Sequence, residues 1–387
     1  MLRSTHSGSN AFFFADIMNS RPIVRAAHLL VLSIACAAAI FAQTAPKQTP
    51  TPDDEIIKVD SQLVMIPVAV TDQQGVAVSG LTAADFRVIE NGKPQVIDSV
   101  GSADKVPLDI ALLFDISATT SPMFKFQAET AAKFLKDVMR PEDRACIFSI
   151  GASPRLVHPL DTAENAAAAL RSIQATKEYT AFYDTVRAAA EYLKQNAPDG
   201  TRRVIVTISD GEDTNSDNIA KALQKGYAEI GRKINTIDSK ELYKLTVATR
   251  DAASRKERQR VLQILQNGDT VFYSINPAGS SFQLNKISTF GQENMQAFAD
   301  ETGGTAFLPK FQPIDTKDNY ANENNDRANT AALDRIFRQL ANEVRSQYLI
   351  QYYSEIDLPP GQYVKLEVTL PSRPGLRSRS RIGYYTK

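Results

Sequence analysis

The chain has 387 residues, of which 43% are hydrophobic, an ordinary share for a globular protein and enough length for roughly two to three compact units. Its formal net charge at pH 7 is zero, because 44 lysines and arginines balance 44 aspartates and glutamates. This balance excludes general electrostatic steering toward nucleic acid or an anionic membrane surface, so no nucleic-acid partner is predicted.

The first 42 residues have the pattern of a secretory signal peptide. Basic residues precede an apolar run over residues 26–42, and a polar, Thr- and Pro-rich linker follows at 43–54. A charged start, a short apolar core and a small final residue are typical of a signal that is cut near Ala42. An uncleaved amino-terminal membrane anchor is the alternative, and Met18 is an alternative start. We therefore expect an exported protein, periplasmic or secreted, with no membrane span after signal cleavage.

Residues 55–103 are predicted to form an all-β segment. A long strand is expected at 56–70, and two further strands, at 86–90 and 95–100, flank the dipeptide Asn91-Gly92. Asn-Gly between alternating strands is a strong signal for a hairpin turn.

From residue 104 the pattern changes to alternating strands and helices. Residues 108–114 form a nearly continuous apolar run, which is typical of a parallel strand that is buried on both faces. The other predicted strands lie at 145–150, 204–208 and 271–275, and the predicted helices at 124–139, 162–173 and 181–193. This alternation predicts an α/β domain, doubly wound and Rossmann-like, over residues 104–345.

Two stretches of this domain depart from the simple pattern. Residues 219–266 hold only helical or polar sequence, about twice what one strand–helix–strand step needs, so a helical insertion is predicted there. After a short helix at 294–302 and an edge strand at 306–308, the Asn-rich residues 312–328 are predicted to form a loop. The apolar spacing at 331–344 then predicts an amphipathic helix.

The chain returns to β structure at its end. Strands are expected at 347–353, 363–370 and 377–385. Because three strands alone rarely make a stable sheet, we predict that residues 346–387 pack with residues 55–103 as one β-sandwich. The α/β domain is then inserted between the two β segments.

Oxygen-bearing side chains follow the predicted parallel strands. Asp115, Ser117 and Thr119 come directly after the first apolar strand, Asp210 follows the strand at 204–208, and Thr180 begins a helix. In open α/β sheets, ligands bind beyond the carboxyl ends of the strands. Carboxylates and hydroxyls are the donors that Mg²⁺ prefers, and two carboxylates neutralise a divalent ion. The sequence therefore predicts a site for Mg²⁺, or for Mn²⁺ or Ca²⁺, with a position left for an anionic outside ligand.

The same residues resemble the metal-ion-dependent adhesion site of the von Willebrand factor type A family. That family's pattern is Asp-x-Ser-x-Ser, a later Thr and a later Asp, and it is matched here by Asp115-Ile116-Ser117-Ala118-Thr119, Thr180 and Asp210. The resemblance covers about 106–345, and the flanks at 81–95 and 381–385 are similar to exported type A-related proteins of acidobacteria. It implies an adhesion-type binding module whose metal coordinates a carboxylate of a protein partner, without catalysis.

Two positions differ from the family pattern. Thr119 replaces the second serine, which keeps a hydroxyl but adds a methyl group to the loop. Tyr179 precedes Thr180 where many bacterial members have glycine. This tyrosine either shields the metal or belongs to the surface that meets the partner.

Two other functions stay open. A metal-dependent hydrolase needs a general base beside the ion; Glu212 and Asp213 are candidates, although both also read as charges at a helix amino terminus. A structural scaffold with a decayed metal site is the second alternative, because Asp and Ser after a strand also serve as turn and helix-capping residues. The oligomeric state is left open.

The remaining reactive side chains carry less information. His158 is the only histidine after the signal and has no nucleophile motif near it, so a surface or packed histidine is expected. Cys146 lies in an apolar run and is expected to be a buried small hydrophobe. Arg377, Arg379 and Arg381 alternate along the last strand and are expected on a solvated sheet face.

Overall fold

The computed structural model describes residues 62–117, 123–176, 178–233, 235–277, 286–312 and 317–386. The predicted signal peptide, the linker and Thr119 lie outside these ranges. Residues 60–387 belong to one compact unit. In the described part of this unit the strands form one six-stranded and two four-stranded sheets. None of its helices has the length and apolar character needed to cross a membrane.

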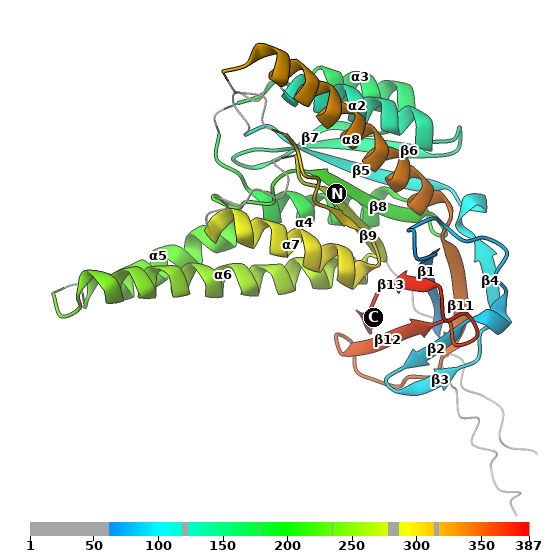
Figure 1. The fold of residues 1–387 in the computed structure, drawn as a ribbon. Helices are drawn as coiled ribbons and strands as arrows, with labels where there is room; N and C mark the ends of the chain where they lie inside the picture. Colours follow the sequence, from blue (N-terminus) through cyan, green and yellow to red (C-terminus); the bar gives the residue numbers. More distant parts are fainter. Residues whose placement is uncertain are drawn as a thin grey trace, which may run out of the picture. The chain divides into compact units, whose positions relative to one another are not determined.

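The six-stranded sheet is the centre of the α/β domain (Figure 1). Its strands, in spatial order, are β10 (Ala306–Phe307), β9 (Thr270–Ile275), β8 (Arg202–Ile208), β5 (Leu108–Asp115), β6 (Arg144–Ile150) and β7 (Pro154–Asp161). The first five pair in parallel, and β7 pairs antiparallel with β6 at the edge. The predicted α/β fold class is confirmed, and β7 is an edge strand that the sequence analysis does not include.

Helices cover both faces of this sheet, which explains its continuous apolar strands. Along β5, Ile110 and Leu112 belong to one core, and Ala111 and Leu113 belong to the other. The first core is covered by α2 (Met123–Val138), α3 (Ala163–Arg171) and α8 (Asn319–Arg345), and the second by α4 (Phe182–Asn196), α7 (Lys286–Thr302) and the helical insertion (Figure 1). Alternate side chains of each strand are thus buried on opposite faces.

The helical insertion is a hairpin of two helices, α5 (Asp217–Gly231) and α6 (Ser239–Asn267). The carboxyl-terminal half of α6 packs on the sheet through Val261 and Leu265, which are fully buried. The loop end of the hairpin extends away from the sheet (Figure 1). Only part of the insertion is therefore fixed by the core of the domain.

The prediction of a loop over 312–328 is wrong for its second half. Helix α8 begins at Asn319, because the Asp318 carboxylate accepts hydrogen bonds from the backbone N–H groups of Tyr320 and Ala321 at 2.9 and 3.1 Å. This N-cap starts a helix that later buries Phe337 and Leu340 against the sheet. The amino-terminal half of α8 has little apolar surface of its own, so the packing of the carboxyl-terminal half stabilises the helix as a whole.

The two β segments pair with each other, as predicted. One sheet has the order β13 (Arg377–Ser380), β1 (Gln62–Thr71), β11 (Tyr348–Ser354) and β4 (Ser99–Ser102), and the other has the order β14 (Gly383–Tyr385), β12 (Tyr363–Thr369), β2 (Arg87–Glu90) and β3 (Lys93–Gln95). Alternate residues of β1 and β12 bury a shared core. The described part of the predicted strand at 56–70 is β1.

A buried carboxylate joins the two sheets of the sandwich. Glu90 of β2 is 1% exposed and accepts hydrogen bonds from the hydroxyls of Tyr352, Tyr384 and Ser354, at 2.6, 2.7 and 2.9 Å. Three donors satisfy the carboxylate oxygens that burial removes from water. This arrangement fixes β2, β11 and β14 relative to one another.

Buried arginines connect the sandwich to the α/β domain. Arg202, at the start of β8, donates to Gln347, whose side-chain amide in turn donates to the Tyr273 hydroxyl at 3.0 Å. Arg381 is 7% exposed and bonds to Asp269 and to the Met65 carbonyl. The expectation that Arg381 lies on a solvated face is therefore wrong, because the last strand runs along the neighbouring domain.

Candidate functional site

The two predicted acidic ligands follow adjacent parallel strands. In the register of β5 and β8, Phe114 lies beside Ile208, so Asp115 and Asp210 emerge at the same edge of the sheet. Both strands are held by the buried core on each face. The fold thus brings two carboxylates together from positions 95 residues apart in the sequence.

Asp115 is held in place by hydrogen bonds to both of its oxygens. One oxygen accepts from the backbone N–H and the hydroxyl of Ser117, at 2.9 and 2.6 Å. The other accepts from the hydroxyl of Ser209 at 2.6 Å. Burial raises the pKa of the Asp115 carboxyl above its usual value, against the effect of these hydrogen bonds, and the nearby negative charge of Glu212 adds to the increase.

Asp210 has an unfavourable environment for a charge. Burial, together with the negative charge of Asp115, raises the pKa of Asp210 to about 7. Its Oδ1 accepts one hydrogen bond from the backbone N–H of Glu212 at 3.0 Å, and the Glu212 charge also favours the protonated form. The Asp115 and Asp210 carboxyls, with the charge of Glu212 nearby, therefore repel one another, and a divalent cation would relieve this repulsion.

Thr180 lies in a loop that is tied to the Asp210 loop. It is 6% exposed, its carbonyl accepts from the backbone N–H groups of Thr214 and Asn215 at 2.8 and 3.0 Å, and its own N–H donates to the Thr214 hydroxyl at 2.9 Å. Tyr179, by contrast, is 70% exposed. The structure thus places Thr180 beside the loop that carries Asp210 and places the Tyr179 ring in solvent.

Two glycines allow the Asp210 loop to approach α7. Gly211 has a φ of +75°, and a Cβ atom built on it would lie 2.4 Å from the carbonyl oxygen of Gly291. A Cβ atom on Gly291 would lie 2.5 Å from the carbonyl oxygen of Asp210. A side chain at either position would displace the backbone that carries Asp210.

Ser209 was not among the predicted ligands, although it contacts Asp115 directly. It is fully buried, and its hydroxyl accepts from the Gly211 N–H at 3.0 Å while donating to Asp115. In the sequence, only the position of Ser209, between the last apolar residue of the strand and Asp210, could have indicated this role. Ser209 therefore orients Asp115 and the Asp210 loop together.

Asp213 has a structural role in this loop. Its carboxylate accepts hydrogen bonds from the backbone N–H groups of Tyr183 and Ser216, both at 3.0 Å, and from the Ser216 hydroxyl. Tyr183 lies in the first turn of α4, so Asp213 caps that helix from outside. Burial raises the pKa of Asp213 above its usual value.

The other reactive side chains lie apart from this edge. His158 belongs to the edge strand β7, where its Nε2 is 3.1 Å from the Asp161 carboxylate. Cys146 is fully buried in β6, and burial raises the pKa of its thiol, so its predicted role as a small hydrophobe is confirmed. Among the described residues, no group of three or more His, Cys, Asp and Glu side chains has the arrangement of a metal site. The candidate site combines carboxylates with hydroxyls instead.

Comparison with known structures gives several weak similarities. A von Willebrand factor type A protein from Catenulispora acidiphila is 11% identical, covers 84% of this chain and 74% of its own, and gives a TM-score of 0.39. An aerotolerance-related membrane protein from Bacteroides fragilis is 15% identical, with coverage of 59% and 99% and a TM-score of 0.33. Proximal thread matrix protein 1 from the mussel byssus, solved with zinc in its adhesion motif, is 10% identical, with coverage of 66% and 49% and a TM-score of 0.37.

Comparison of the sequence alone is more informative. No curated protein sequence matches the chain. The sequence model of the von Willebrand factor type A domain matches residues 110–212. The match begins within β5, which leads to Asp115, and ends two residues after Asp210. It therefore contains all five predicted metal ligands. Residues 110–212 are thus identified by this sequence model as a von Willebrand factor type A domain.

Proposed function

We propose that this domain binds a divalent cation and, through it, a carboxylate of a protein partner. Asp115, Ser117, Thr119, Thr180 and Asp210 would hold the ion, with Mg²⁺ preferred and Mn²⁺ or Ca²⁺ as alternatives. The observation that carries the proposal is the convergence of Asp115 and Asp210 at the ends of two adjacent parallel strands. Thr119 lies outside the described residues, and its assignment rests on the sequence pattern.

The donor chemistry supports a hard cation. Two aspartates and several hydroxyls supply only oxygen, which Mg²⁺, Mn²⁺ and Ca²⁺ accept. The buried carboxylates are difficult to ionise without a cation, since burial and mutual repulsion both raise their pKa values. A bound divalent ion would retain attraction for an anion, so an aspartate or glutamate of a partner is a suitable outside ligand.

We also propose that the protein acts outside the cytoplasm and is a binding module without enzymatic activity. Export is inferred from the signal-like pattern that ends near Ala42. Among the candidate bases for a hydrolase, Asp213 is occupied as a helix cap, which supports binding over hydrolysis.

The metal proposal is tested by thermal unfolding of the purified protein in EDTA and in Mg²⁺, Mn²⁺ or Ca²⁺. A ligand that binds only the folded state raises the melting temperature in a concentration-dependent way. We expect this increase in the wild type and not in Asp115→Ala. Asp199→Asn, an exposed carboxylate before β8, is the matched control and should respond like the wild type. If no ion shifts the wild type, the oxygen cluster is a capping arrangement or a decayed site.

A further inference from the structure

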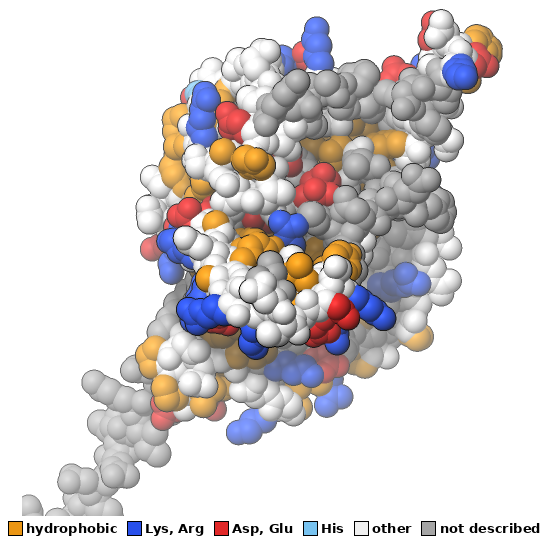
Figure 2. All heavy atoms as spheres, turned by 90° about the vertical axis from the view of Figure 1, so that its left-hand side faces the viewer, with side chains coloured by type: hydrophobic (Ala, Val, Ile, Leu, Met, Phe, Trp, Pro, Cys, Tyr) orange, Lys and Arg blue, Asp and Glu red, His pale blue; other side chains and the backbone are white. Residues whose placement is uncertain are grey.

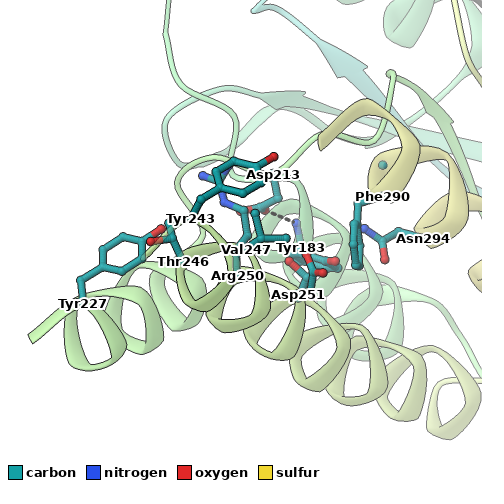
Figure 3. Close-up of a pocket in the computed structure, with 12 residues that line it drawn as sticks. Tyr183, Asp213, Tyr227, Tyr243, Thr246, Val247, Arg250, Asp251, Phe290 and Asn294 are labelled. Atoms are coloured by element: carbon teal, nitrogen blue, oxygen red, sulfur yellow. Dashed lines mark hydrogen bonds between the residues drawn. The ribbon is translucent and has the colours of Figure 1, made fainter. Parts of the chain in front are cut away.

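A cavity of about 460 Å³ lies between the helical insertion and α7 (Figure 3). One face of α6 forms its longest wall, through Tyr243, Val247, Arg250, Asp251 and Ser254. These positions follow helical spacing, so the insertion presents a continuous stripe to the cavity. The volume lies within the range typical of small-molecule sites.

The cavity adjoins the candidate metal loop but uses different side chains. Asp213, which follows the Asp210 loop, lines it, and so does Gly291, whose carbonyl contacts Gly211. None of the predicted metal ligands that the structure describes is among its lining residues. The cavity is therefore a separate site.

Two opposite charges line the cavity without a partner. Arg250 and Asp251 are half-buried, and neither makes an ion pair or a hydrogen bond with another residue in the described ranges. On the same helix, Arg260 pairs with Glu257 at 3.1 Å. Within the Arg250 guanidinium only Nε is enclosed by protein, and no oxygen of Asp251 is enclosed. The terminal nitrogens of Arg250 and the Asp251 carboxylate are therefore open to a ligand.

Helix geometry keeps these two charges apart. Consecutive residues of an α-helix point about 100° away from each other around its axis, and Val247 and Ser254 occupy the directions between Arg250 and Asp251. The two groups thus stand on either side of the stripe that faces the cavity. A ligand with one charge would pair with one group and remove water from the other, whereas a ligand with both charges satisfies both.

The remaining polar groups of the lining are already used. The Tyr183 hydroxyl interacts with Ser254 and Asn294 and is enclosed by protein. The Asp213 carboxylate accepts hydrogen bonds from the backbone N–H groups of Tyr183 and Ser216, both at 3.0 Å. The two unpaired charges on α6 are therefore the groups that select a ligand.

Aromatic and apolar groups form the rest of the cavity. Phe290 of α7 faces Val247 of α6 across it, and Tyr243 and Tyr227 lie toward the loop end of the hairpin (Figure 3). Tyr243 is 64% exposed and Tyr227 is 40% exposed. Seen from the hairpin tip, hydrophobic side chains gather beside the two helices, with charged side chains around them (Figure 2). Such walls suit a large apolar or aromatic side chain.

We propose that this cavity binds a free α-amino acid with a large apolar or aromatic side chain. Its carboxylate accepts hydrogen bonds from the Arg250 guanidinium, its ammonium group donates to the Asp251 carboxylate, and its side chain packs between Phe290 and Val247. A free amino acid carries both charges on one carbon atom, whereas a peptide separates its two termini. This site does not require the metal, so its test is independent of the proposed metal-dependent function.

Binding is measured on the purified protein in EDTA by isothermal calorimetry and ligand-observed NMR, with L-phenylalanine as the probe. For a ligand of this size we expect a dissociation constant on the order of 0.1–1 mM. Phenethylamine lacks the carboxylate and 3-phenylpropionate lacks the ammonium group, so each should bind about 10-fold more weakly. L-Alanine keeps both charges without the ring and should also bind about 10-fold more weakly.

Two variants assign the charges separately. Arg250→Gln should weaken L-phenylalanine about 10-fold and leave phenethylamine unchanged, because phenethylamine has no carboxylate to lose a partner. Asp251→Asn should weaken L-phenylalanine about 10-fold and leave 3-phenylpropionate unchanged. Neither should lower the melting temperature, since neither residue has a partner in the described part of the fold. Arg255→Gln, at an exposed arginine of α6 outside the lining, is the matched control and should bind like the wild type.

Val247→Trp fills the cavity and should abolish binding while circular dichroism shows a folded protein. The proposal is overturned if L-phenylalanine fails to bind, or if either ligand with a single charge binds as tightly as L-phenylalanine. Full affinity in the folded Val247→Trp variant, or equal affinity in wild type, Arg250→Gln and Asp251→Asn, would also overturn it.

Discussion

Replacing Asp210 with asparagine should have opposite effects on stability with and without metal. The pKa of Asp210 is raised to about 7 by burial and by Asp115. An unfolded aspartate has a pKa of about 3.9, and each unit by which folding raises the pKa corresponds to about 1.4 kcal/mol. Keeping Asp210 ionised in the folded protein at pH 8 therefore costs roughly 4 kcal/mol. Asparagine removes this charge and keeps the oxygen that accepts from the Glu212 N–H.

In EDTA at pH 8, Asp210→Asn should therefore be more stable than the wild type. We expect a gain of about 1–3 kcal/mol, below the full cost because the new amide N–H₂ group also loses water. In saturating Mg²⁺ the order should reverse. An ion at about 1,000 times its dissociation constant stabilises the wild type by about 4.1 kcal/mol, which exceeds the variant's lead, and the variant, which lacks one ligand, gains nothing.

The assay is urea unfolding followed by far-ultraviolet circular dichroism, because the chain has no tryptophan to report by fluorescence. Asp199→Asn, the exposed control, should change neither value. If Asp210→Asn is less stable than the wild type in EDTA, the carboxylate is not a repulsive group in the metal-free fold. If the variant still gains stability from Mg²⁺, Asp210 is not a ligand.

Three further predictions follow from the same structure. In EDTA, the wild type should gain about 1 kcal/mol as the pH falls from 8 to 6, because a carboxyl with a raised folded pKa contributes stability that is lost as pH rises toward that pKa; urea titrations should show this gain, and a flat profile would contradict it. Glu90→Ala should lower the unfolding free energy by about 3 kcal/mol or more, because it removes the hydrogen-bond acceptor of three buried hydroxyls, whereas a loss under about 1 kcal/mol would mean that the sandwich does not depend on this carboxylate. Arg381→Ala should cost about 3 kcal/mol through the loss of its bonds to Asp269 and Met65, while the Mg²⁺-dependent increase in melting temperature stays unchanged; loss of that increase would show that the junction and the metal site are coupled.

The sequence predicts the α/β domain and the place of its candidate site because both depend on local patterns. Apolar runs such as 108–114 indicate strands that are buried on both faces, and Asp115 and Asp210 follow directly from the ends of two of them. The pairing of β5 with β8 then brings the two aspartates to one edge. Parallel connectivity makes residues distant in sequence neighbours at predictable positions.

Features that depend on tertiary contacts were not predictable in this way. The start of α8 at Asn319 rests on a cap and on packing of its distant second half, whereas an Asn-rich sequence alone indicates a loop. The alternating sequence pattern predicts that Arg381 is exposed to solvent, because it does not show the contact of Arg381 with Asp269 of the neighbouring domain.

The attachment of the sandwich bears directly on how a partner would reach the metal. Arg202 and Asp269, which contact Gln347 and Arg381 of the sandwich side, stand at the amino ends of β8 and β9. Asp210 stands beyond the carboxyl end of β8, seven strand residues away, or about 20 Å. The sandwich therefore contacts the sheet at the amino ends of its strands, opposite to the candidate site at their carboxyl ends. This arrangement leaves the end of the sheet that carries the candidate site, with the exposed Tyr179 at its border, as the face on which the proposed partner would bind.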